Sequence, residues 1–126
     1  MERVSFTIEF LFKASNTIVY RFLTAPDCLI RWFCDKADIE DNAYIYSWDG
    51  EEEVADIIED IEDEYLKLLS DEAEGDNEFL EFRLSKSPVT NETILLITDW
   101  ADADEVEDQK ALWTKQMTAM KTAMGG

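Results

Sequence analysis

Histidine is absent from the 126 residues of this sequence. Histidine is the side chain that most readily exchanges a proton near neutral pH, and it is the commonest ligand of transition metals. Its absence excludes Ser-His-Asp and Cys-His catalytic arrangements and the usual tetrahedral zinc sites that combine cysteine and histidine. We therefore predict no catalytic residues, no dedicated metal ion and no cofactor, and a protein that is not an enzyme.

Glycine and cysteine are scarce as well. The sequence has four glycines, and neither G-x-G-x-x-G nor the P-loop pattern occurs, so no phosphate-cradling loop is expected. Its two cysteines, Cys28 and Cys34, form no C-x-x-C pair, and six residues along a helix would place them on different faces. They are expected to be reduced, partly buried thiols, which is typical of a cytoplasmic protein.

Long apolar runs are missing. The longest, such as Ile94-Leu95-Leu96-Ile97, is far shorter than the roughly 20 residues that a membrane-spanning helix needs. Residues 4–9 alternate between apolar and polar side chains, whereas a signal peptide has a continuous apolar core. The sequence predicts a soluble, cytoplasmic protein with no membrane span.

Positive charge is in short supply. Eleven Lys and Arg residues stand against 30 Asp and Glu residues, and residues 49–126 carry 17 of the 19 net negative charges. Such a surface repels nucleic acids and anionic membranes, since both are bound through basic side chains. High net charge usually serves solubility. A basic protein partner is the alternative that this surface leaves open.

Apolar material for a core is plentiful, at 46% of the residues, with 12% aromatic. The length predicts one domain over residues 1–126. Residues 4–12 alternate with period two and predict a strand. Ser15 can cap a helix over residues 16–24, and Pro26 suits the first turn of a second helix that carries Leu29, Ile30, Trp32 and Phe33.

Strands and one long helix are expected in the remainder. Strands are predicted at residues 44–48, ended by the turn Asp49-Gly50, and at residues 64–70, 77–86 and 92–100, with an acidic loop at 71–76. Regular spacing of strands and turns indicates an antiparallel meander. A long amphipathic helix then ends at Gly125-Gly126, and its apolar stripe contains Val106, Trp113, Met117, Met120 and Met124.

Residues 51–62 are ambiguous. Val54, Ile57, Ile58 and Ile61 follow the helical period of 3.6, so periodicity alone favours a helix. We predict a strand there only because of the resemblance described next.

The order of these elements, and the local sequence, resemble START-like (SRPBCC, Bet v 1-like) domains, which have the helix-grip fold. Within that superfamily the likeness is to domains related to the activator of heat-shock protein 90 ATPase, and it spans about residues 3–124. It depends on Ala14-Ser15-Asn16, Val19-Tyr20, Leu23-Thr24-Ala25-Pro26-Asp27, Leu29, Trp32-Phe33, Trp48-Asp49-Gly50, Thr98-Asp99-Trp100, Leu112-Trp113 and Met120.

The resemblance implies an α+β fold in which a curved antiparallel sheet, in the order β-α-α-β-β-β-β-β-β-α, grips the C-terminal helix and leaves a cavity. The hairpin at residues 34–43 is shorter than in relatives, which implies a smaller or more closed cavity. Packing in the core is the alternative for the candidate cavity residues, and it is the commoner role of apolar side chains on an inward face. The candidate cavity residues are Phe33, Tyr46, Trp48, Phe82, Trp100, Trp113, Met117 and Met120.

Three functions remain open. The first is non-catalytic binding of a lipid-like or other apolar or amphipathic small molecule in the cavity. The second is a chaperone-activator-like interaction module that uses the acidic region 49–78 to dock a basic protein. The third is an enzyme in which Tyr or Glu moves protons inside the cavity, which the absence of histidine disfavours.

Overall fold

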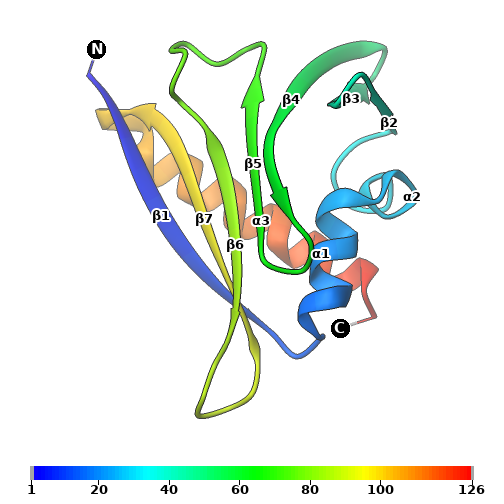
Figure 1. Ribbon diagram of the computed structural model, residues 1–126. Helices are drawn as coiled ribbons and strands as arrows, with labels where there is room; N and C mark the ends of the chain where they lie inside the picture. The colour runs from blue at the N-terminus through cyan, green and yellow to red at the C-terminus, as the bar shows by residue number, and fades with distance from the viewer. Residues whose placement is uncertain (1, 126) are drawn as a thin grey trace.

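The computed structural model describes residues 2–125 and contains one antiparallel sheet of seven strands (Figure 1). The order of strands across the sheet is β1-β7-β6-β5-β4-β3-β2. The predicted order of elements along the chain, and with it the α+β helix-grip architecture, is confirmed. The strands are β1 (Arg3–Phe12), β2 (Lys36–Glu40), β3 (Ala43–Trp48), β4 (Glu51–Ile61), β5 (Tyr65–Ser70), β6 (Leu80–Lys86) and β7 (Thr93–Asp102); the helices are α1 (Asn16–Thr24), α2 (Pro26–Leu29) and α3 (Val106–Ala123), with the 3-10 turn η1 (Ala103–Glu105) before α3.

Neighbouring strands in the sequence are also neighbours in the sheet from β2 to β7, as expected for a meander, and β1 adds at the far edge by pairing with β7. The sheet curves around α3, which crosses its concave face behind β7, β6 and β5 in Figure 1. The guanidinium of Arg31 donates to the carbonyl of Ala123 and so ties the segment after α2 to the end of α3. The concave face and the helix together enclose the core.

The two short helices follow the sequence signals only in part. Ser15 caps α1 as predicted, its hydroxyl accepting from the Ile18 amide at 3.3 Å. Pro26 opens α2, but this helix ends at Leu29 and does not extend to Phe33 as predicted. The amides of Trp32, Phe33 and Cys34 all donate to the carbonyl of Leu29, so the chain closes into a turn there.

Residues 51–61 form the strand β4, and the reason for their helix-like pattern is a β-bulge. The pairing of β4 with β5 shifts register between Ile57 and Glu59, which moves the apolar side chains by one position relative to the pleat. Before the bulge Ala55 is buried in the core, whereas Ile58 in the bulge and Ile61 after it are exposed. The family resemblance was right here, and periodicity alone was misleading.

The turn predicted at Asp49-Gly50 is confirmed, and a second tight turn joins β2 to β3. Asp49 and Gly50 join β3 to β4 with φ values of 48° and 86°, and Asp41 and Asn42 join β2 to β3 with φ values of 49° and 62°. Positive φ at both central residues is the geometry of the tight turn that matches the twist of a hairpin. The strand predicted over 77–86 begins only at Leu80, because the Glu78 amide closes a turn onto Gly75.

The stripe of α3 faces the core as predicted. Trp113, Met117 and Met120 are buried, and Val106 and Met124 pack at the edge of the same cluster. Gly125 continues past the helix with a φ of 95°, and its predicted partner in the helix stop, Gly126, lies outside the described residues. Apolar burial across this stripe holds the helix against the sheet.

Replacing Met120 with Ala tests this packing. Met120 is fully buried, so Met120→Ala leaves a cavity and is expected to lower the free energy of unfolding by about 2–5 kcal/mol. Urea unfolding followed by circular dichroism measures the change. Thr118→Ala, on the exposed face of the same helix, is the control and is expected to change stability by less than about 0.5 kcal/mol.

Candidate functional site

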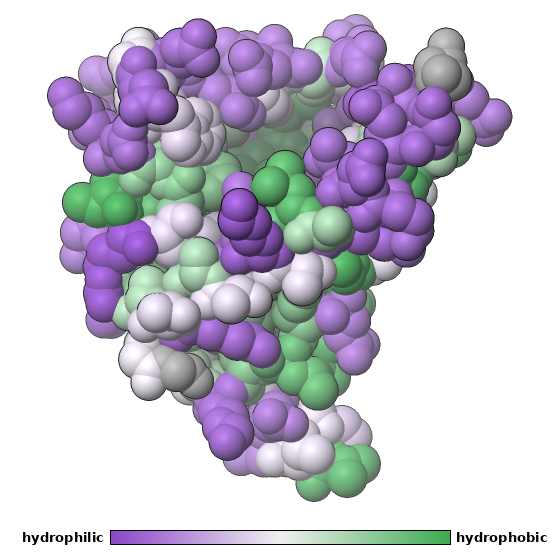
Figure 2. Space-filling model, turned by 180° about the vertical axis from the view of Figure 1, so that it is seen from behind, coloured by the Kyte–Doolittle hydropathy of each residue, from purple (hydrophilic) through white to green (hydrophobic). Residues whose placement is uncertain are grey.

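A cavity of about 330 Å³ opens between the sheet and the first half of α3. Figure 2 shows it as a hollow near the top of the molecule, with hydrophobic groups inside and hydrophilic groups around the opening. We call it the outer cavity. It is lined by Arg3, Phe33, Trp48, Glu53, Ser70, Glu72, Ala73, Glu78, Leu80, Asp99, Trp100, Gln109, Leu112, Trp113 and Gln116.

A smaller space of about 50 Å³, the inner recess, adjoins the outer cavity. The two share the lining residues Phe33, Glu53, Ser70, Leu80 and Trp113. The other residues around the inner recess are almost all apolar, so its walls favour a hydrocarbon group. They are Leu23, Leu29, Trp32, Tyr46, Ala55, Leu68 and Phe82.

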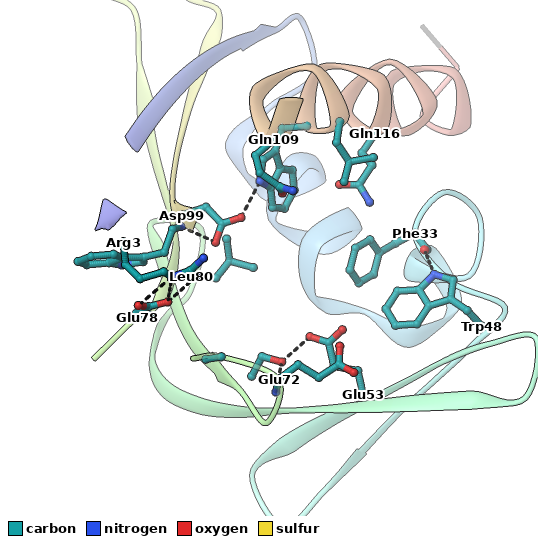
Figure 3. Close-up of a pocket in the computed structure, with 15 residues that line it drawn as sticks. Arg3, Phe33, Trp48, Glu53, Glu72, Glu78, Leu80, Asp99, Gln109 and Gln116 are labelled. Atoms are coloured by element: carbon teal, nitrogen blue, oxygen red, sulfur yellow. Dashed lines mark hydrogen bonds and ion pairs between the residues drawn. The ribbon is translucent and has the colours of Figure 1, made fainter. Parts of the chain in front are cut away.

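Aromatic side chains form one wall of both spaces (Figure 3). The Phe33 ring packs edge-on against Tyr46 and Trp48, with centroid distances of 4.9 and 5.2 Å. The Trp48 indole N–H donates to the Phe33 carbonyl at 2.6 Å, which fixes the indole in place. These contacts hold the wall rigid, because aromatic pairs prefer such edge-to-face arrangements.

Most of the predicted cavity residues do gather around these two spaces. Phe33, Trp48, Trp100 and Trp113 line the outer cavity, and Phe33, Tyr46, Phe82 and Trp113 line the inner recess. Two do not reach either space. Met117 and Met120 are 1% and 0% exposed and pack in the core below, which agrees with the core alternative for these two side chains.

Two carboxylates in the cavity, Glu53 and Asp99, were not predicted as site residues. Both lie on the concave face of the sheet, where apolar side chains are expected. Asp99 continues the inward series of Leu95 and Ile97 on β7, and Glu53 precedes the inward Ala55 on β4. The alternation of side chains along these strands was the signal in the sequence, but the pairing of the strands decides its phase and so which face each acid is on.

Glu53 is held by a short relay of hydrogen bonds. The hydroxyl of Ser70 donates to Glu53 Oε2 at 2.6 Å, and the same hydroxyl oxygen accepts from the Glu72 amide at 3.0 Å. Partial burial raises the pKa of the Glu53 carboxyl, and the neighbouring acids Glu72, Asp71 and Asp99 raise it further, while the Ser70 hydrogen bond works in the opposite direction. The Glu53 carboxyl therefore loses its proton less readily than an ordinary glutamate does.

Asp99 links the sheet to the helix. Its Oδ2 accepts from the Trp113 indole N–H at 2.9 Å, and its Oδ1 accepts from the Trp100 amide at 2.8 Å. Burial raises the pKa of the Asp99 carboxyl, although these hydrogen bonds and the charge of Arg3 oppose the increase. In Figure 3 the carboxylates of Asp99 and Glu53 lie on two sides of the cavity.

Arg3 closes one end of the opening. Its guanidinium forms ion pairs with Glu78 at 2.6 Å, Glu74 at 2.9 Å and Asp102 at 3.2 Å. Glu74 and Glu78 belong to the acidic connection between β5 and β6, and Asp102 ends β7. One cation therefore fastens this connection to the β1-β7 edge beside the cavity.

Other reactive groups lie outside the cavity. The thiols of Cys28 and Cys34 are buried and unbridged, and burial raises the pKa of Cys34 to about 11, so this thiol is protonated near neutral pH. Carboxylate oxygens of Asp102, Asp104 and Glu105 lie within 4.8 Å of one another on the surface. Asp102 already pairs with Arg3.

Comparison with known proteins gives the family. The model of a START-like superfamily domain matches residues 1–126. The chain belongs to this superfamily. The prediction made from the order of elements and the local motifs is thereby confirmed. No curated protein matches this START-like chain, and none of its described helices is long and apolar enough to cross a membrane.

Solved structures with the same fold include three from bacteria. BfR322 from Bacteroides fragilis is 26% identical, with 97% of this chain and 91% of that one covered and a TM-score of 0.70. The Aha1 dimer from Colwellia psychrerythraea is 17% identical, with 96% of each chain covered and a TM-score of 0.81. CalU16 from Micromonospora echinospora is 18% identical, with 95% of this chain and 75% of that one covered and a TM-score of 0.73.

Removing the charge of Arg3 is expected to loosen the β5–β6 connection. In Arg3→Gln the ion pairs to Glu74, Glu78 and Asp102 are lost, so the Glu78 amide, which closes the turn onto Gly75, should exchange with solvent at least about tenfold faster. Hydrogen exchange measured by NMR tests this. Lys110→Gln, which removes only an exposed pair with Glu107, should leave that amide unchanged.

Glu53→Gln is expected to raise the melting temperature at pH 7. The pKa of Glu53 is higher in the folded protein than in the unfolded chain, so its contribution favours folding at low pH and is lost as pH rises through the folded pKa. Gln carries no charge and can still accept from Ser70. The gain should shrink as pH falls through the raised pKa of the wild-type carboxyl, which then becomes protonated itself.

Glu52→Gln is the matched control for this measurement, because it removes the same charge from the neighbouring exposed residue of β4. Calorimetric scans of both variants from about pH 4 to pH 8 separate the local effect from the general relief of acidic repulsion. Equal gains in the two variants would contradict a desolvated Glu53.

Proposed function

We propose that this START-like domain binds a small amphipathic or apolar molecule without transforming it, in the outer cavity and inner recess between the sheet and α3. The observation that carries the proposal is the pair of adjoining spaces: an opening of about 330 Å³ with polar and aromatic walls, and an apolar recess of about 50 Å³ behind it. Ligand sites in proteins have volumes of roughly 300–1,000 Å³ and are mostly apolar with a few polar groups.

The arrangement of the walls supports the same proposal. Phe33 packs edge-on against both Tyr46 and Trp48, so these side chains are already ordered and lose little conformational entropy when a ligand binds. The small size of the spaces agrees with the short hairpin at residues 34–43. A ligand about the size of a substituted aromatic or a medium-length alkyl chain fits this volume better than a sterol or a diacyl lipid.

Acid–base catalysis is the second candidate, and one observation favours it. Glu53 and Asp99 are carboxylates in the cavity whose pKa values are raised, and such groups are found at catalytic sites. Asp99, however, already accepts from Trp113 and Trp100, which is the arrangement of a structural acceptor. Chemical conversion of a bound ligand, lost in Glu53→Gln, would establish this function instead of simple binding.

Docking of a basic protein on the acidic region 49–78 stays a prediction. The exposed part of this region includes the connection that Arg3 fastens, so its charge is partly neutralised at one point. Salt-sensitive binding of a basic partner would support it, since exposed charges are screened over about 8 Å at physiological ionic strength.

A ligand screen by NMR tests the proposed function. Compounds with an apolar body and one polar group are expected to shift the indole N–H signals of Trp48 and Trp113, which line the outer cavity. Leu80→Trp, which places a larger side chain where both spaces meet, should abolish the shifts. Ile58→Trp, on the exposed outer face, is the matched control and should preserve them. Binding that survives Leu80→Trp in a folded protein would exclude this site.

A further inference from the structure

The cavity lining points to a particular kind of ligand. We infer that the outer cavity selects a cationic amine carried on an apolar body, with its ammonium group hydrogen-bonded to Glu53 and its hydrocarbon part directed into the inner recess. This inference rests on the proposed function, because it names the chemical class of ligand for that same site.

Charge is distributed unevenly around the cavity. Its walls contain four acidic side chains, Glu53, Glu72, Glu78 and Asp99, and one basic side chain, Arg3. The charge of Arg3 is already engaged by Glu74, Glu78 and Asp102. Among residues 2–125, no lysine or arginine nitrogen lies within 4.0 Å of a Glu53 or Asp99 oxygen. The described part of the cavity lining therefore offers no positive charge that is not already paired with a carboxylate.

Glu53 is placed to meet such a charge. It lines the outer cavity and the inner recess alike, so a group bound to it stands where the polar opening meets the apolar interior. One oxygen, Oε2, is fixed by Ser70 at 2.6 Å, and Oε1 accepts no hydrogen bond from the described side chains. In Figure 3 the carboxylate of Glu53 points into the cavity.

The aromatic wall adds to this selection. Phe33 and Trp48 lie on the same side of the cavity as Glu53 in Figure 3, and aromatic faces attract cations. An anionic ligand would meet Glu53 and Asp99 with no free cation to compensate, so a fatty acid is disfavoured. A neutral ligand would leave Oε1 without a charged partner. An ammonium group supplies N–H donors for Oε1 and a positive charge that compensates the carboxylates.

Three probes with the same hydrocarbon chain separate these possibilities: 1-octylamine, 1-octanol and octanoate. At about 0.15 M salt, which screens exposed charges, octylamine is expected to bind the wild-type protein about tenfold or more tightly than the other two. In Glu53→Gln its affinity should fall about tenfold, since a charge-assisted hydrogen bond is lost. The affinity for octanol should change less than about twofold. Titrations followed at the Trp48 and Trp113 indole signals give the dissociation constants.

Diffuse attraction of an amine to an acidic protein is the main competing explanation, and Glu52→Gln controls for it. This variant has the same net charge as Glu53→Gln but is altered outside the cavity, so octylamine should bind it as it binds the wild type. Equal losses of affinity in the two variants would overturn the inference.

The remaining outcomes distinguish the inference from the proposed function. Binding of octanol or octanoate at least as tightly as octylamine would overturn the amine selection and leave a ligand-binding cavity. If none of the three probes shifts the indole signals of the folded protein, both the amine selection and the proposed function fail.

Discussion

The structure depends on one contact surface, that between the apolar stripe of α3 and the concave face of the sheet. Met117 and Met120 are enclosed at its centre, where methionine can fill irregular space between the curved strands. Trp113 adds a directional contact, because its indole N–H donates to Asp99 on β7. The bend of the sheet, the position of the helix and the space left near its first turns all follow from this packing.

That space exists because the core is filled unevenly. Towards the end of α3 the methionines occupy the gap between helix and sheet, whereas near its beginning the facing positions on β4 and β7 hold Glu53 and Asp99. Carboxylates there cannot be packed as hydrocarbon can, and their pKa values are raised because burial removes water from the charged form. Burying these carboxylates costs free energy of folding. The protein tolerates that cost at a cavity, where departures from a purely apolar core are commonly connected with function.

Sequence reasoning identified the aromatic lining but not the acids. Phe33, Trp48, Trp100 and Trp113 stand out as large side chains in a recognisable order, whereas Glu53 and Asp99 are two of 30 acidic residues. Only the pairing of strands shows which acids face inward. The sequence also predicted that Met117 and Met120 lie on the inward face of α3. It could not show that both are fully buried in the core and do not line the cavity.

The sequence by itself determined the family, the order of the elements and the hairpin turn at Asp49-Gly50, because these depend on local preferences and on motifs a few residues long. The tertiary structure decided the bulge in β4 that gives residues 51–61 their helix-like pattern, and it decided which charges line the cavity. Each of these depends on a partner distant in the chain or on the phase of pairing between strands. Local sequence does not contain that information, since a shift of one residue reverses which side chains face the core.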